Sequence, residues 1–175
     1  MQQRINAVFL DRDGVINHER DYLYKIEDFK FIDGVIEALS YLQSKNYALF
    51  IITNQSGIGR GYYSEQDFKT LTKWMLKELL ENKIQISKVC YCPHIYEDNC
   101  NCRKPKTGMI DDIMNSWNID IENSWLIGDK DSDIECALNV GINNTIQVKS
   151  GHQFIKENSK EKYILNSLKD INKII

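Results

Sequence analysis

The chain has 175 residues, 42% of them apolar, which is enough for a sizeable core, and we expect a single domain over residues 1–175. Its 22 basic and 25 acidic side chains are mixed along the sequence and give a formal net charge of -3, which excludes the basic stripe of a nucleic-acid-binding protein. No apolar run approaches the ~20 residues that span a bilayer, and the polar Met1–Asn6 segment lacks the apolar core of a signal peptide, so we expect a cytoplasmic monomer without a membrane partner.

Short apolar runs alternate with helical patterns along the chain. The runs predict buried parallel strands at Ala7–Leu10, Ala48–Ile52, Lys88–Tyr91, Trp125–Ile127 and Thr145–Val148. Helical spacing of apolar side chains occurs in three places: at Val35, Leu39 and Leu42, at Phe68, Leu71, Met75 and Leu79, and at Ile134, Ala137 and Leu138. Ser64 can cap the second helix, Gly141 can end the third, and Tyr163–Ile175 predicts an edge element and a closing helix. This alternation predicts a doubly wound α/β fold with a parallel sheet, in which ligands bind beyond the carboxyl ends of the strands.

Two carboxylates follow the first predicted strand. Because side chains alternate along a strand, Asp11 and Asp13 can converge on one point while Arg12 faces away. A hard cation such as Mg²⁺ binds carboxylate oxygens and would offset the repulsion between the two acids. The alternative is a polar turn that closes the strand.

Hydroxyl and amide side chains follow the second predicted strand, at Thr53, Asn54, Gln55 and Ser56. Such a loop can donate hydrogen bonds to phosphate oxygens. The glycines at 57, 59 and 61 do not fit the dinucleotide-binding fingerprint, because Tyr62 stands where its third glycine would be, and no P-loop Lys-Ser/Thr pair follows. A helix-entry turn is the alternative, so the phosphate interpretation depends on the neighbouring motifs.

Three thiols and one imidazole lie in the irregular segment after the third strand, at Cys92, His94, Cys100 and Cys102. They form a complete ligand set for tetrahedral zinc, and buried or redox-active cysteines are the alternative. A site with four protein ligands leaves no open position, so this zinc would be structural. We expect the remaining two cysteines to lie in a strand and in the core, respectively: Cys90 and Cys136.

Charged residues complete the pattern at two further positions. A basic cluster follows the fourth zinc ligand at Arg103-Lys104-Pro105-Lys106, and it could neutralise a phosphate if the metal loop holds it, although such runs are usually solvated surface. The fourth strand leads into Asp129 and Lys130, which supply a third carboxylate and another lysine.

Together these motifs resemble the haloacid dehalogenase (HAD) superfamily of phosphatases over nearly the whole chain. The resemblance implies that Asp11 is the nucleophile, that Asp13 is the general acid and base, and that Thr53 and Lys104 bind the phosphate. It also implies a catalytic Mg²⁺ held by Asp11, Asp13 and Asp129, with Asp13 offering its backbone carbonyl.

Within the superfamily, the motifs at 53–61, 102–105 and 128–130 and the Cys/His pairs are similar to the heptose 1,7-bisphosphate 7-phosphatases, whose near relatives are the histidinol-phosphate phosphatases. This similarity implies conversion of a heptose bisphosphate to heptose 1-phosphate for surface-glycan synthesis, without a large cap domain. The implied substrate contacts are Thr53, Asn54, Gln55, Ser56, Arg103, Lys104, Lys130 and Tyr22. The five residues between the inner zinc ligands make a shorter loop than many of these enzymes carry. Open alternatives are a histidinol-phosphate phosphatase, a non-catalytic phosphoacceptor and a zinc-binding interaction module.

Overall fold

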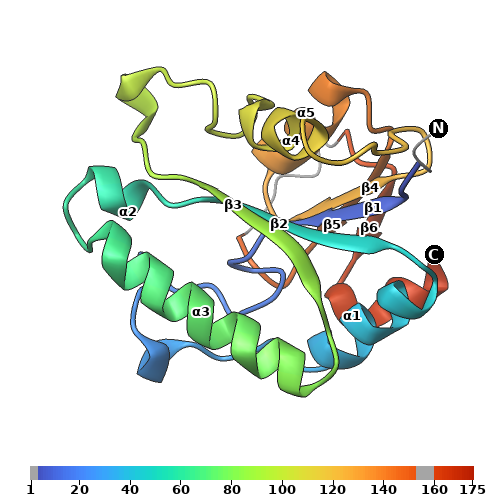
Figure 1. Ribbon diagram of the computed structural model, residues 1–175, viewed down its shortest axis with the longest axis horizontal. Helices are drawn as coiled ribbons and strands as arrows, with labels where there is room; N and C mark the ends of the chain where they lie inside the picture. The colour runs from blue at the N-terminus through green and yellow to red at the C-terminus, as the bar shows by residue number, and fades with distance from the viewer. Residues whose placement is uncertain (1–3, 153–159) are drawn as a thin grey trace.

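A computed structural model describes residues 4–152 and 160–175 of the chain (Figure 1). Its sheet has six parallel strands in the order β3-β2-β1-β4-β5-β6. The strands are β1 (Ala7–Leu10), β2 (Ala48–Asn54), β3 (Ile86–Cys92), β4 (Trp125–Gly128), β5 (Asn144–Val148) and β6 (Tyr163–Leu165). The chain builds outward from β1 on one side and from β4 on the other, so the strand order switches between these two strands. The predicted doubly wound α/β fold is confirmed.

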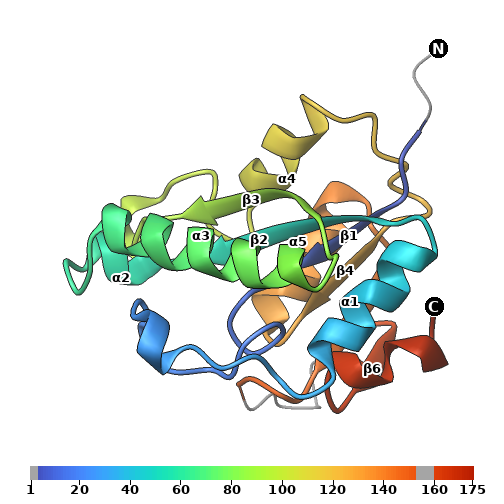
Figure 2. The same cartoon turned by 60° about the horizontal axis from the view of Figure 1, so that its bottom comes forward.

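The helices cover both faces of this sheet. They are α1 (Val35–Ser44), α2 (Ser56–Gly59), α3 (Glu65–Glu81), α4 (Gly108–Met114) and α5 (Asp131–Val140), with 3₁₀ turns at Ile26–Asp28, Tyr96–Asp98 and Leu168–Lys173. Helices α1 and α3 lie on one face, and α4 and α5 lie on the other (Figures 1 and 2). The predicted caps are present: the Ser64 hydroxyl accepts the Asp67 N–H at 3.1 Å, and Gly141 ends α5 with φ +93°.

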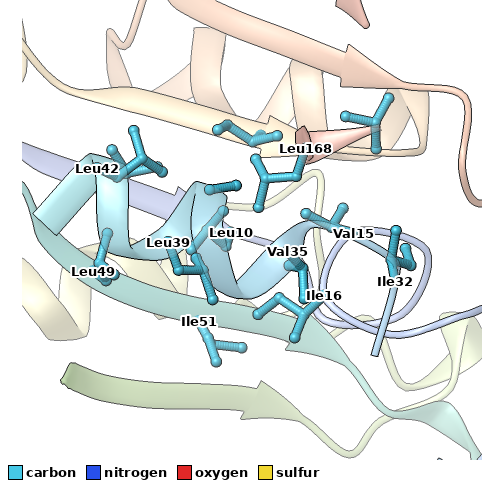
Figure 3. Close-up of a cluster of buried hydrophobic side chains, with 14 of the residues drawn as sticks. Leu10, Val15, Ile16, Ile32, Val35, Leu39, Leu42, Leu49, Ile51 and Leu168 are labelled. Atoms are coloured by element: carbon cyan, nitrogen blue, oxygen red, sulfur yellow. The ribbon is translucent and has the colours of Figure 1, made fainter. Parts of the chain in front are cut away.

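Each face of the sheet buries its own apolar core, and β1 contributes to both. Val8 and Leu10 point into the core that α1 and α3 cover, whereas Ala7 and Phe9 point into the opposite core. In the first core, Leu10 lies with Leu39 of α1 and with side chains of the carboxyl-terminal 3₁₀ helix (Figure 3). Because all four β1 residues are fully buried, the strand fixes the position of whatever follows Leu10.

Some boundaries differ from the sequence prediction. Strand β2 runs two residues further, because residues 53 and 54 still pair with β3, and β3 itself spans Ile86–Cys92. Helices α2 and α4 were not predicted, since each is short and carries too few apolar side chains for a clear period. The predicted edge element and closing helix are present as β6 and the 3₁₀ helix Leu168–Lys173.

Neither of the two segments in which an inserted cap domain would lie contains one. Residues 14–34 and 93–107 each hold only a single 3₁₀ turn within the part of the chain that the structure describes. No helix in residues 4–152 or 160–175 has the length and apolar character needed to cross a membrane.

Candidate active site

A pocket of about 390 Å³ lies at the carboxyl ends of the central strands. Nearly all of the predicted acids and substrate contacts line it: Asp11, Asp13, Tyr22, Thr53, Asn54, Gln55, Ser56, Arg103, Lys104 and Lys130. Asp129 is fully buried beside the pocket rather than on its wall. Residues that are up to 119 positions apart in the sequence therefore meet at one edge of the sheet, as the strand-end argument predicts.

Lys104 lies between two carboxylates at the base of this pocket. Its Nζ is 3.1 Å from Asp11 Oδ1 and 2.7 Å from Asp133 Oδ1, and it donates a hydrogen bond to the Ile52 carbonyl at 2.7 Å. Burial raises the pKa of Asp11, and the Lys104 ammonium opposes that shift. Although burial disfavours the ammonium, the two carboxylates raise the pKa of Lys104, so this side chain is a fixed cation.

Asp129 offers one free carboxylate oxygen to the site. Its Oδ2 accepts the His152 backbone N–H at 2.8 Å and lies 2.7 Å from His152 Nδ1, whereas its Oδ1 has no hydrogen-bond partner among the described residues. Burial, together with the Asp11 charge, raises the pKa of Asp129. Gly14 permits this packing, because its φ is +83° and a Cβ there would lie 2.6 Å from Asp129 Oδ2.

Three carboxylates thus gather beyond β1 and β4. Oxygen atoms of Asp11, Asp129 and Asp133 all lie within 4.8 Å of one another. An unpartnered buried carboxylate oxygen next to a second carboxylate is a favourable environment for a hard divalent cation, which takes oxygen ligands. The donor set at this position therefore fits Mg²⁺.

Asp13 lies beyond the end of β1, where the sequence prediction was wrong about Arg12. The backbone turns after Leu10, and the N–H groups of residues 15–17 donate to the Arg12 carbonyl. Strand alternation does not extend through this turn. The Arg12 side chain therefore does not face away from Asp13: its Nη2 lies 2.9 Å from both carboxylate oxygens.

Two side chains of the second predicted motif, Gln55 and Asn54, make hydrogen bonds to other residues of the site. Gln55 Nε2 donates to Asp13 Oδ2 at 3.0 Å and to Thr53 Oγ1 at 2.8 Å, and the Tyr63 hydroxyl donates to Gln55 Oε1 at 2.5 Å. Asn54 holds the backbone of Lys104, accepting its N–H at 3.0 Å and donating to its carbonyl at 3.2 Å. Asn54, which the sequence predicts as a substrate contact, fixes the loop that carries Lys104.

The four predicted zinc ligands come together in one cluster. Cys92 Sγ lies 3.5 Å from Cys100 Sγ and 2.9 Å from Cys102 Sγ, and His94 Nδ1 is 3.6 Å and 3.3 Å from the Cys92 and Cys102 sulfurs. Thiolates around a tetrahedral zinc lie about 3.8 Å apart. The Cys92–Cys100 distance is close to this value, and the Cys92–Cys102 distance is shorter. Cys136 is buried in the core beneath α5, as predicted.

Three residues of the site were not assigned roles from the sequence. Asp133 contacts Lys104 and lies in the first turn of α5, four positions after Asp129, so its place just beyond a strand end could have indicated it. The Arg12 side chain was predicted to face away from the two acids and was given no role. His152 follows β5 in a segment with no distinctive pattern, and only the fold brings it to Asp129.

Comparisons with known proteins agree on the family. A family model described as HAD-hydrolase-like matches residues 101–171. The chain is 46% identical over 170 residues to a D-glycero-alpha-D-manno-heptose-1,7-bisphosphate 7-phosphatase of Campylobacter jejuni, covering 95% of this chain and 98% of the relative. It is 42% identical over 176 residues to a D-glycero-beta-D-manno-heptose-1,7-bisphosphate 7-phosphatase of Pasteurella multocida, covering 97% and 96%.

A solved structure gives the same result in three dimensions. The D,D-heptose 1,7-bisphosphate phosphatase of B. bronchiseptica, complexed with magnesium and phosphate, superposes with a TM-score of 0.85 at 25% identity, covering 97% of each chain.

Proposed function

The chain belongs to the heptose-1,7-bisphosphate 7-phosphatase family of HAD-like hydrolases, and on this basis we propose that it removes the 7-phosphate of a D-glycero-D-manno-heptose 1,7-bisphosphate. The observation that carries the proposal is the contact between Asp11, at the end of the central strand, and the fixed cation of Lys104, 3.1 Å away. A carboxylate nucleophile and a rigid ammonium side by side suit phosphoryl transfer, which depends on positioning and charge neutralisation.

In the proposed reaction, Asp11 attacks phosphorus in line with the leaving oxygen and becomes an aspartyl phosphate. Lys104 and the Thr53 hydroxyl bind oxygens of the transferring group. Asp13 gives a proton to the departing sugar oxygen and later takes one from the water that hydrolyses the intermediate. Asp133 holds Lys104 in place and caps α5 by accepting the Lys130 N–H at 3.0 Å.

We propose that the carboxylates of Asp11 and Asp129 and the backbone carbonyl of Asp13 hold Mg²⁺. The unpartnered Oδ1 of Asp129 supports this assignment. When bound, the ion would neutralise charge on the transferring phosphate.

The substrate preference can be predicted from the basic side chains of the pocket that do not bind the transferred phosphate. Arg103 and Lys130 both line the pocket, and Arg103 is anchored to the zinc loop through a 3.3 Å hydrogen bond to the His94 carbonyl. A planar guanidinium can bind two oxygens of a second phosphate. Histidinol phosphate carries a cationic amine instead, so we expect it to be a poorer substrate by roughly ten- to a thousandfold in kcat/KM.

The measurement compares both heptose bisphosphate anomers with histidinol phosphate on the wild type and on Arg103→Ala. Arg103→Ala should lower kcat/KM for the bisphosphate more than for a small monophosphate, because only the former has a second phosphate to lose. If the wild type has a higher kcat/KM for histidinol phosphate than for either bisphosphate, the heptose assignment is wrong and the protein is a histidinol-phosphate phosphatase.

We also propose that Cys92, His94, Cys100 and Cys102 hold one structural zinc ion per chain. The cluster leads directly into Arg103 and Lys104, so the metal would fix the basic residues of the pocket.

The zinc proposal predicts different results for two similar substitutions. Cys100→Ser should lose the zinc and lower turnover by about 10²-fold, the loss that a misplacement of about 1 Å can cause. Cys90→Ser is the matched control, because Cys90 lies on β3 outside the cluster. It should keep both zinc and turnover. Elemental analysis of protein purified without chelator measures the zinc, and a wild-type preparation free of zinc would refute the assignment.

A further inference from the structure

Arg12 is almost completely buried, with 1% of its surface exposed, although a guanidinium is costly to remove from water. Phe68 packs against the guanidinium, with the ring centre 5.7 Å from Cζ. The hydrogen bonds that the guanidinium makes therefore indicate what it does.

These hydrogen bonds are directed mainly to one carboxylate. Nε and Nη2 of Arg12 lie 3.2 Å and 2.9 Å from Asp13 Oδ1, and Nη2 is also 2.9 Å from Oδ2. The only other acceptor among the described residues is the Leu23 carbonyl, 3.3 Å from Nη2, and Nη1 has none. A paired fork of this kind restricts both the position and the rotation of a carboxylate.

Two further donors complete the surroundings of Asp13. Asn17 Nδ2 donates to Oδ1 at 3.0 Å and Gln55 Nε2 donates to Oδ2 at 3.0 Å. Of the three donors, only Arg12 contacts both oxygens and carries charge.

From this geometry we propose that Arg12 is a positioning residue for the general acid and base Asp13. The inference rests on the proposed phosphatase reaction and adds a residue whose side chain contacts neither phosphate nor a metal-ligand oxygen in that scheme. Only its backbone N–H does so, donating to Asp11 Oδ1 at 2.8 Å. By holding the Asp13 carboxylate in one orientation, Arg12 directs it toward the leaving oxygen and the attacking water. Its hydrogen bond to Leu23 also ties the acid to the loop of residues 19–23 on the pocket wall.

The test uses the dependence of rate on the leaving group. An ester with a good leaving group needs little protonation, whereas a poor one depends on the acid. The probes are p-nitrophenyl, phenyl and benzyl phosphate, which are similar in shape and become progressively worse leaving groups. Arg12→Met should lower kcat/KM for benzyl phosphate by roughly 10- to 100-fold, part of the effect of a positioned acid, and for p-nitrophenyl phosphate by less than about threefold.

A double-mutant cycle separates positioning from damage to the fold. Asp13→Asn should show the same leaving-group dependence, and adding Arg12→Met to it should cost less than about threefold more, because the residue through which Arg12 acts is already disabled. Leu79→Ala, a buried substitution in α3 away from the pocket, is the stability control and should keep the wild-type ratio between the three esters.

If Arg12→Met does not fold, Arg12→Lys carries the test. It keeps the charge but not the fork, and it should lose about 10-fold on benzyl phosphate with little change on p-nitrophenyl phosphate. Equal losses on all three esters, or full additivity with Asp13→Asn, would show that Arg12 is merely structural. A wild-type protein that cleaves none of the esters and no heptose bisphosphate would instead refute the proposed function, and the role of Arg12 with it.

Discussion

Asp11→Asn is expected to lower turnover by roughly 10⁴- to 10⁶-fold, as loss of a catalytic nucleophile does, while the protein stays folded. The amide has the shape of the carboxylate but cannot attack phosphorus. Stability should change by no more than about 1 kcal/mol, because burial already disfavours the Asp11 charge and Asp133 remains paired with Lys104.

Turnover and urea unfolding of the same preparations measure the two effects. Asp112→Asn is the matched control, since this exposed acid on α4 pairs only with Lys88 and Cys90 within residues 4–152 and 160–175. Acid-quenched mass spectrometry of the wild type should find the phosphate on Asp11. Near wild-type turnover in Asp11→Asn would remove the nucleophile assignment.

Most of the fold and the arrangement of the site could be predicted because the sheet is parallel and buried on both faces. Such strands appear as continuous apolar runs, and in a doubly wound fold their carboxyl ends lie at one edge. The polar residues after Leu10, Ile52 and Ile127 therefore had to lie near one another, whatever their separation along the chain.

The predictions failed where the backbone leaves regular structure. Alternation of side chains holds only within a strand, and the turn after Leu10 brings Arg12 onto Asp13 instead of away from it. The contact between His152 and Asp129 depends on where the loop after β5 returns, which no local pattern specifies. Helix α4 is too short for its apolar spacing to be distinctive.

Lys104→Met is expected to affect both activity and stability, because this lysine is the cation between Asp11 and Asp133. Turnover should fall by roughly 10²- to 10³-fold, as when a donor that stabilises transition-state charge is removed. The free energy of unfolding should drop by about 3–5 kcal/mol at neutral pH, since removing one partner leaves buried carboxylates uncompensated. Lys88→Met is the control: its ion pair with Asp112, whose side chain is 60% exposed, lies at the surface and should contribute little.

The loss of unfolding free energy in Lys104→Met should become smaller as the pH falls. Burial raises the pKa of Asp11 and of Asp129, and Lys104 opposes this shift for Asp11. Without the ammonium, the pKa of Asp11 rises further in the folded state, while the unfolded value stays at about 3.9. Between these two values the folded protein binds a proton that the unfolded chain does not, so its stability must increase as pH falls.

Urea unfolding of the wild type and Lys104→Met at about pH 8 and about pH 5 tests this direction. The difference in unfolding free energy between the two proteins should be smaller at the lower pH, because protonation of Asp11 relieves the uncompensated charge. The wild-type lysine shows no matching effect in this range: its raised pKa means that its contribution is lost only as pH rises above about 10.5. A difference that stays constant or widens on acidification would mean that Lys104 does not neutralise Asp11, and the electrostatic basis of the proposed nucleophile would fail with it.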